Sequence, residues 1–274
     1  MAGFVSTAYL QKANDQVWNI AYMNGGALVP VFIALSSTLP TAAGGNVTEP
    51  NTGTNYGGYQ REAFQSPTTA SAGACSNGGV ITFPTVGHPD GFVAGYYAAY
   101  NLSSGGTMIF AGTFSAAITC KASCPVFVPI GDITLAFTDA IAGLTVAGAN
   151  YLIDILSGRT TGGANSAYIS FYTTLPTNSQ VANTNEAAYT SYARTSHSGK
   201  IAAATSANPS VTATNAEIDG PMATAGTSTI VGWGAGPTAS GATALYLAGG
   251  CTSQVIGVGN APALGSATNL SSLS

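Results

Sequence analysis

The chain has 274 residues, of which only 6% are charged, and its formal net charge is −4. An ordinary soluble domain has about 25% charged residues, and electrostatic binding to nucleic acid or to an anionic membrane needs clusters of Lys and Arg. With six basic residues in the whole chain, the sequence predicts neither nucleic acid nor a membrane as partner. The apolar share of 46% argues against disorder and for domains with buried cores.

The first half of the chain is predicted to begin with a helix and to continue as short strands. Residues 8–22 have apolar side chains at helical spacing, with Leu10, Ala13 and Val17 on one face, and two glycines follow at the expected end. The turn-rich segment 101–106 indicates a hairpin between two of the strands. Strands are predicted at 31–35, 59–65, 79–83, 92–100, 107–114, 125–129 and 133–137.

The second half repeats this order of predicted elements. A short helix is predicted within 150–156, ahead of the first strand of this half. Strands are predicted at 167–173, 190–196, 216–218, 229–233, 242–248 and 255–259. The final segment, 266–274, is small and polar, and we expect it either to lie over a neighbouring protein or to fray.

Several phrases recur at a long and nearly constant spacing. Residues 31–40 (VFIALSSTLP) return as 167–176 (AYISFYTTLP), a shift of 136, because 167 − 31 = 136. Glu49 returns as Glu186, and Arg61 returns as Arg194. Solenoid repeats have periods of roughly 20–50 residues, so this period indicates a duplicated domain. The predicted fold is mainly β, with two tandem antiparallel β-sandwich domains, 1–140 and 141–274, each led by a short α-helix.

Five features of the first half are similar to a known group of proteins. They are residues 32–40 with Glu49 and the Gly-Gly-Tyr-Gln-Arg phrase of 57–61, the NGGVITFP phrase of 77–84, and the VPIGDIT phrase of 128–134. In this order they resemble small virion proteins of tailed bacteriophages, of the tail-fibre-like and head-decoration-like group. The resemblance covers most of residues 8–137 and weakens in the second half.

This resemblance implies a non-enzymatic structural protein at the virion surface, made in the host cytoplasm. Together with the low charge it favours a protein that decorates or cements the capsid. The alternative is a tail-fibre or collar component, including a host-binding adhesin, in which the aromatic segment 95–100 could stack on sugars or pack in the core. The implied partners are other virion proteins, either the major capsid protein or tail and collar proteins, and further copies of this chain in a homo-oligomer or repeated array.

Catalytic, metal and cofactor motifs are not found in the sequence. The two histidines, His88 and His197, lie outside nucleophile motifs such as Gly-x-Ser-x-Gly, and each is expected to be a surface or turn histidine. Glu217 and Asp219 alternate on one predicted strand face and are expected to point to solvent or to a partner. No cysteine pair has the two-residue spacing of a zinc site. The sequence therefore predicts no catalytic, metal or cofactor site.

Two other sets of residues are candidates for a structural role. Arg61 and Arg194 recur at equivalent positions in a chain with few basic residues, so we expect each to be an anchor that bonds carbonyl groups or the acids Glu49 and Glu186. The spacing of Cys120 and Cys124 is short enough to close a small loop by a disulfide. A protein made in the cytoplasm keeps its thiols reduced, so the sequence leaves the state of this pair open.

Overall fold

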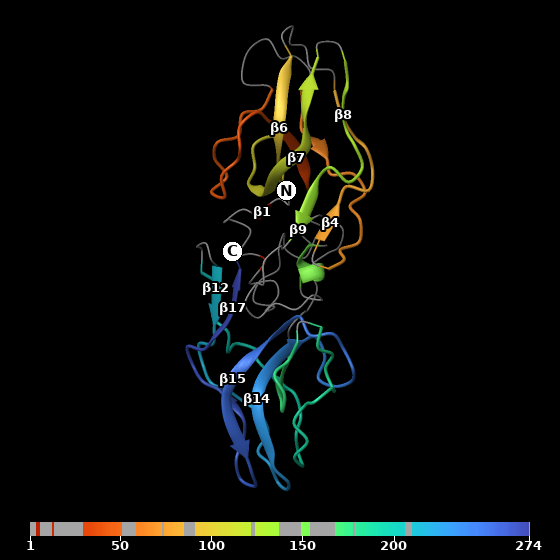
Figure 1. Cartoon of the computed structure of the whole chain (residues 1–274). Coiled ribbons are helices and arrows are strands. Elements are labelled where there is room, and N and C mark those ends of the chain that lie inside the picture. The colour runs from red at the N-terminus through yellow and green to blue at the C-terminus, as the bar shows by residue number, and fades with distance from the viewer. Residues whose placement is uncertain are drawn as a thin grey trace. The chain divides into compact units, whose positions relative to one another are not determined.

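The computed structural model shows a mainly β protein built from antiparallel sheets (Figure 1). This confirms the predicted fold class. The structure describes residues 4–5, 13, 30–50, 59–72, 74–84, 91–121, 124–136, 149–153, 168–177, 179–205 and 210–273. The described residues fall into two compact units, the first containing 30–136 and the second containing 168–273.

The first unit is organised around a five-stranded sheet with the order β1-β7-β6-β2-β3. Its centre is a long hairpin in which Tyr97 of β6 is opposite Gly112 of β7. Both faces of the central strands are covered, because Leu35, Tyr97 and Phe110 are fully buried on one face, and on the other face the paired residues Ala34, Ala98 and Ala111 are fully buried too. The strand bounds are β1 Phe4–Val5, β2 Phe32–Ser36, β3 Glu62–Ala63, β6 Phe92–Tyr100 and β7 Met108–Cys120.

Two short ladders form the second layer of the first unit. One pairs β4 (Ala74–Ser76) with β9 (Thr134–Ala136), and the other pairs β5 (Ile81–Phe83) with β8 (Val126–Val128). The layers are joined by the Tyr97 hydroxyl of the large sheet, which donates a hydrogen bond of 2.8 Å to the Thr134 carbonyl of β9. A buried tyrosine needs such a partner for its hydroxyl, so this bond allows the ring to lie between the layers.

The second unit has a four-stranded sheet with the order β11-β10-β14-β15. Its core contains Phe171 and Tyr172 of β10 and Trp233 of β14. Two short ladders, β12 with β17 and β13 with β16, accompany this sheet. The bounds are β10 Tyr168–Tyr172, β11 Thr195–Ser196, β12 Ser210–Ala213, β13 Ile218–Asp219, β14 Ser228–Gly236, β15 Leu247–Ile256, β16 Ala263–Leu264 and β17 Asn269–Leu273.

The strands of the two units correspond one to one from β2 and β10 onward. Strands β2 to β9 pair in the same pattern as β10 to β17, and β1 is an addition to the first sheet. One irregularity also coincides: the β6–β7 ladder shifts register between Ala94 and Tyr96, and the β14–β15 ladder does so between Ile230 and Gly232, a displacement of 136 at both positions. The β6–β7 ladder has a further shift between Ala99 and Tyr100. Ladder order and the shared bulge position therefore repeat with the sequence period.

The predicted leading helices can be compared with the structure only in part. Of residues 8–22, only Ala13 is described; it is helical, fully buried and grouped with the second unit. Residues 149–153 are helical, within and just ahead of the range predicted from the sequence. The expected boundary near residue 140 lies outside the described residues, so the division into 1–140 and 141–274 remains a prediction.

Several strand predictions were displaced or wrong. Strand β15 begins at Leu247 and continues through Gly249 and Gly250, where the sequence predicted an end. A Cβ atom on Gly249 would lie 3.1 Å from the buried Trp233 ring, so glycine suits this close approach. A Cβ atom on Gly250 would lie 3.1 Å from the end of the exposed Leu175 side chain. The segment 255–259 is not a strand of its own: β15 ends at Ile256, and the next strand begins at Ala263.

The C-terminal segment was also predicted incorrectly. Residues 269–273 form β17 and pair with β12 of the same unit, and Leu270 is buried there. Backbone pairing needs no apolar periodicity along the whole strand, so a small polar sequence can still close a ladder. Phe4 and Val5 likewise pair with β7, opposite Ala111 and Phe110.

Candidate functional site: two arginine–glutamate clamps

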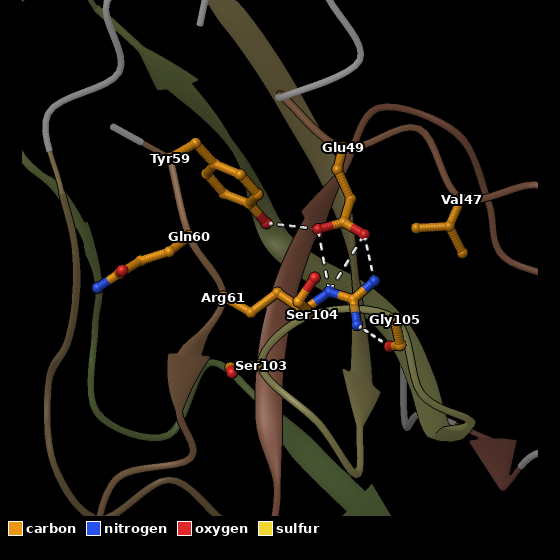
Figure 2. Close-up of a pocket in the computed structure, with 8 residues that line it drawn as sticks. All are labelled: Val47, Glu49, Tyr59, Gln60, Arg61, Ser103, Ser104 and Gly105. Atoms are coloured by element: carbon orange, nitrogen blue, oxygen red, sulfur yellow. Dashed lines mark hydrogen bonds and ion pairs between the residues drawn. The ribbon is translucent and has the colours of Figure 1, made fainter. Parts of the chain in front are cut away.

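In the first unit, Arg61 and Glu49 form an ion pair beside the β6–β7 hairpin (Figure 2). The Arg61 Nη2 atom is 2.6 Å from Glu49 Oε1, and Nε is 3.1–3.2 Å from both carboxylate oxygens. The side chains of Arg61 and Glu49 are only 11% and 19% exposed. The planar guanidinium matches the planar carboxylate, which makes this arrangement stronger than contact with a single lysine charge.

Arg61 makes further contacts through its Nη1 group and through the face of its guanidinium. Its Nη1 donates to the carbonyl oxygens of Leu102 and Gly105 in the loop between β6 and β7, which is 41 to 44 residues away in sequence. Its guanidinium carbon lies 3.6 Å from the centre of the Tyr100 ring, a cation–π contact. Burial opposes the charge on Arg61, but the hydrogen bonds and charge of Glu49 outweigh it and raise the pKa of the guanidinium. Arg61 therefore clamps the hairpin tip to the loop that carries Glu49.

Tyr59 also contacts this clamp, through its hydroxyl group. Its hydroxyl accepts the backbone N–H of Leu35 at 3.0 Å and donates to Glu49 Oε2 at 3.2 Å. Burial is the main cause that raises the Tyr59 pKa, and the nearby Glu49 charge raises it further. The ring stacks parallel to Phe83 with 6.1 Å between ring centres. The hydroxyl thus connects strand β2 with the ion pair.

The second unit repeats the clamp with Arg194 and Glu186. Arg194 Nε donates to Glu186 Oε1 at 2.8 Å, and Nη1 donates to the carbonyl of Thr238 at 3.1 Å. Nη2 donates to the carbonyl of Gly241 at 2.7 Å and to Asn183 Oδ1 at 2.8 Å. Gly105 and Gly241 are equivalent in sequence, and both have positive φ angles, 65° and 86°. Each arginine therefore binds the loop of its own long hairpin.

A tyrosine again connects this clamp to the sheet. The Tyr192 hydroxyl accepts the backbone N–H of Phe171 at 3.0 Å, as Tyr59 accepts that of Leu35. Burial, followed by the charge of Glu186, raises the Tyr192 pKa. The tyrosine that donates to the glutamate differs: Tyr172 donates to Glu186 at 3.4 Å, whereas in the first unit Tyr59 donates to Glu49.

Around the first clamp lies a pocket of about 340 Å³. Its lining residues are Val47, Glu49, Tyr59, Gln60, Arg61, Ser103, Ser104 and Gly105. Figure 2 shows the Glu49 carboxylate, the Tyr59 hydroxyl and the Arg61 guanidinium converging at this site. The pocket is therefore polar, with the ion pair forming part of its wall.

The structure places the four predicted anchor residues in two pairs, each within its own unit. The sequence did not single out Tyr59, Tyr192, Tyr100 or the hairpin glycines. The phrase Tyr-x-Arg, present at 59–61 and again at 192–194, was the signal that could have identified the two tyrosines.

The other residues considered for chemistry lie elsewhere. His88 is outside the described residues, and His197 is buried. Glu217 and Asp219 are exposed. Among the described residues, no three His, Cys, Asp or Glu side chains gather closely enough to hold a metal ion. Nor does the described part of the chain contain a helix with the length and apolar character needed to cross a membrane.

Cys120 and Cys124 form no disulfide in the structure. Cys120 is the last residue of β7 and is fully buried, opposite Phe92, whereas Cys124 is exposed after a turn in which its N–H bonds the Lys121 carbonyl at 3.2 Å. Burial raises the pKa of the Cys120 thiol to about 11, which disfavours the reactive thiolate.

Residues 11–136 match the family model described as Gp80, podophage GP4 fiber I protein gp80. The match covers a little under half of the chain and ends where β9 ends. It supports a phage structural protein of the fibre type. No curated protein matches the chain.

Proposed function

We propose that this chain is a structural subunit of a phage fibre. The family match over residues 11–136 carries this proposal, because that range contains strands β2 to β9 and the first clamp, and the family is described as a fibre protein. The sequence favoured decoration of the capsid head. The family description favours a fibre instead, and no feature of the described residues favours the head.

The second unit is proposed to be a diverged duplicate of the first. The matching ladder order, the coincident bulges and the two clamps support this relationship. A duplication would double the number of clamped hairpins that one chain offers to the assembly. In this proposal the chain is an assembly protein with no catalytic role.

The surface proposed to contact another virion subunit is the outer face of the β5–β8 ladder. Phe127 of β8, Val80 next to β5 and Ile130 in the turn after β8 are 55%, 48% and 62% exposed. The equivalent positions in the second unit are Glu217, Ala263 and Ser266. They are assigned from strand pairing, because Thr82 pairs with Phe127 as Asp219 pairs with Ala263. One face is therefore apolar where its counterpart is acidic and polar. An apolar patch of this kind is typical of a protein interface.

The location of the chain on purified virions tests the fibre role. An antibody raised against the chain, followed by gold labelling and electron microscopy, should decorate the fibres. Quantitative mass spectrometry of the same particles should give a copy number near that of the fibre and far below that of the capsid protein. Gold spread over the head, with copies comparable in number to the capsid protein, would overturn the proposal.

The contact surface has its own test. Phe127→Ser should weaken incorporation of the chain into particles, because it removes the largest exposed apolar side chain of the patch. Val255→Ser, at a position 71% exposed in the second unit, is a matched control. Equal incorporation of the two variants would remove the β5–β8 face from the proposal.

A further inference from the structure

The pocket beside the first clamp has the size and lining of a small-ligand site. Its volume of about 340 Å³ is near the lower end of the range of about 300–1,000 Å³ typical of such pockets. Ligand pockets are usually lined mostly by apolar side chains. Here Val47 and the ring of Tyr59 are the apolar parts of the lining, and the other groups are hydroxyl, amide, carboxylate, guanidinium and backbone. This lining suits a ligand rich in hydrogen-bonding groups.

The pocket carries no excess charge. Arg61 and Glu49 are the charged residues of its lining, and they neutralise each other at 2.6 Å. An anionic ligand such as a phosphate or a carboxylate would contact the Arg61 guanidinium, which is already paired with Glu49. A ligand ammonium group would contact the Glu49 carboxylate, which is already paired with Arg61. The electrostatics favour a neutral ligand, whose binding should depend little on salt.

Hydrogen-bonding groups remain available at the rim. Within the described part of the chain, the hydroxyls of Ser103 and Ser104 have no hydrogen-bond partner, and both residues are exposed. The Gln60 amide uses one N–H on Glu62, at 3.0 Å, which leaves its carbonyl oxygen as an acceptor. Ser103 and Ser104 lie on the hairpin loop beside the clamp, whereas the Gln60 amide points away from the ion pair (Figure 2). The two serine hydroxyls can each donate and accept, as the hydroxyl groups of a polyol require.

The second unit shows that the clamp itself does not require these groups. Gln60 stands between Tyr59 and Arg61, and its counterpart between Tyr192 and Arg194 is Ala193. The counterpart of Ser103, between the two hairpin carbonyls that the arginine binds, is Ala239. The second clamp holds its hairpin with alanine at both positions. The polar rim is therefore an extra feature of the first unit.

From this geometry we propose that the first unit binds a neutral saccharide of one or two rings in the pocket. Sugar hydroxyls would bond the Ser103 and Ser104 hydroxyls, and one sugar face would lie against Val47. Tyr97 and Tyr100 of the segment 95–100 are not the platform, because both are buried. The site does not depend on the fibre assignment, because it can be tested on the purified chain.

Saturation-transfer NMR on the full chain is the test, with glucose, galactose, N-acetylglucosamine, maltose and lactose as probes. At least one probe should bind with a millimolar dissociation constant, and the affinity should be the same at low and high salt. The double variant Ser103→Ala with Ser104→Ala removes both rim hydroxyls, and it should fold normally because both residues are exposed. It should bind roughly tenfold more weakly or worse, because two hydrogen bonds are lost.

Ser240→Ala is the matched control, since Ser240 is the counterpart of Ser104 in the second unit and should not affect binding. A thermal melt of each variant checks that it is folded. No binding by any probe at millimolar concentration would overturn the proposal, and so would unchanged affinity in the double variant. Either failure would leave the location of the chain on the virion, and hence the fibre role, untouched.

Discussion

Arg61 and Arg194 hold equivalent hairpins, because each guanidinium joins a glutamate to the carbonyl of the glycine in the hairpin loop. The chain has only six basic residues and uses two of them in this way. A guanidinium has five N–H donors in a fixed plane, so it can bind a carboxylate and several loop carbonyls at once. Few charged groups are needed when each one makes several contacts.

Arg61→Ala should lower the free energy of unfolding of the first unit by about 1–3 kcal/mol, because Glu49 and the loop carbonyls lose their donor. Chemical denaturation followed by tyrosine fluorescence measures the change. Lys121→Ala is the control, because Lys121 is exposed and its removal should change stability by less than about 0.5 kcal/mol. Equal stability of the two variants would show that the clamp is an ordinary surface pair.

Tyr59→Phe should destabilise the first unit by about 1–2 kcal/mol, because it leaves the buried Leu35 N–H without its acceptor. Tyr192→Phe should have a similar effect on the second unit, through the N–H of Phe171. Hydrogen exchange of these two amides, followed by NMR, is the sharper measurement. Unchanged protection of the Leu35 amide in Tyr59→Phe would contradict the role given to the hydroxyl.

The buried tyrosines predict a loss of stability at alkaline pH. Burial raises the pKa of Tyr97 to about 12 and that of Tyr172 to about 12, whereas an unfolded tyrosine has a pKa of about 10. The folded state keeps the proton that the unfolded state releases. The stabilisation is therefore complete below about pH 10 and is lost as pH rises toward about 12.

The check is a titration that records circular dichroism together with tyrosinate absorbance. Ionisation of the buried tyrosines should coincide with unfolding, since their folded pKa values lie above the value of the unfolded chain. Complete tyrosinate formation with native circular dichroism would contradict this prediction.

Removal of residues 269–273 should destabilise the second unit and leave the first unit nearly unchanged. The deletion removes β17, the ladder partner of β12, and exposes the site that Leu270 fills. Limited proteolysis should then cleave after residue 162 before it cleaves within 30–136. Leu270→Ala is a milder version, with an expected cost of about 2–3 kcal/mol. A truncated chain that resists protease as well as the full chain would show that β17 is dispensable.

Attachment to the particle should resist salt and yield to denaturant. With few charges, the interfaces must depend on apolar contact and backbone hydrogen bonds, which salt screens little. Virions washed in roughly 1 M salt should therefore keep the chain, and virions in dilute urea should lose it before the capsid opens. Release by salt alone would mean that ion pairs govern attachment.

The sequence predicted most clearly what is local or repeated. The 92–100 strand and the hairpin after it follow from aromatic and β-branched residues around a Gly-rich turn, and β6 has these bounds. Arg61 and Arg194 were identified because they recur in a chain with few charges. In both cases the signal is present in a short stretch or in its repetition.

Other features depend on contacts that no local pattern encodes. The carbonyl of Gly105 lies 44 residues from Arg61, and the Tyr100 ring beneath the guanidinium has no aromatic counterpart in the second unit, where the equivalent residue is Gly236. Strand β15 continues through two glycines, with the buried Trp233 ring close to the first of them. These features depend on residues that are close in space but distant in sequence, so only the folded structure shows them.

The ladders that contain the last strand of each unit, β4–β9 and β12–β17, have a consequence for synthesis on the ribosome. Strand β9 returns to pair Ala136 with Ala74, and β17 returns to pair Leu273 with Ser210. The last strand translated in each half therefore completes its ladder with one made much earlier. At a translation rate of about 5–20 residues per second, β9 emerges on the order of ten seconds before β17. The first sheet system could thus mature while the second nascent segment is still being extended, which would limit mispairing between two halves that share one strand order.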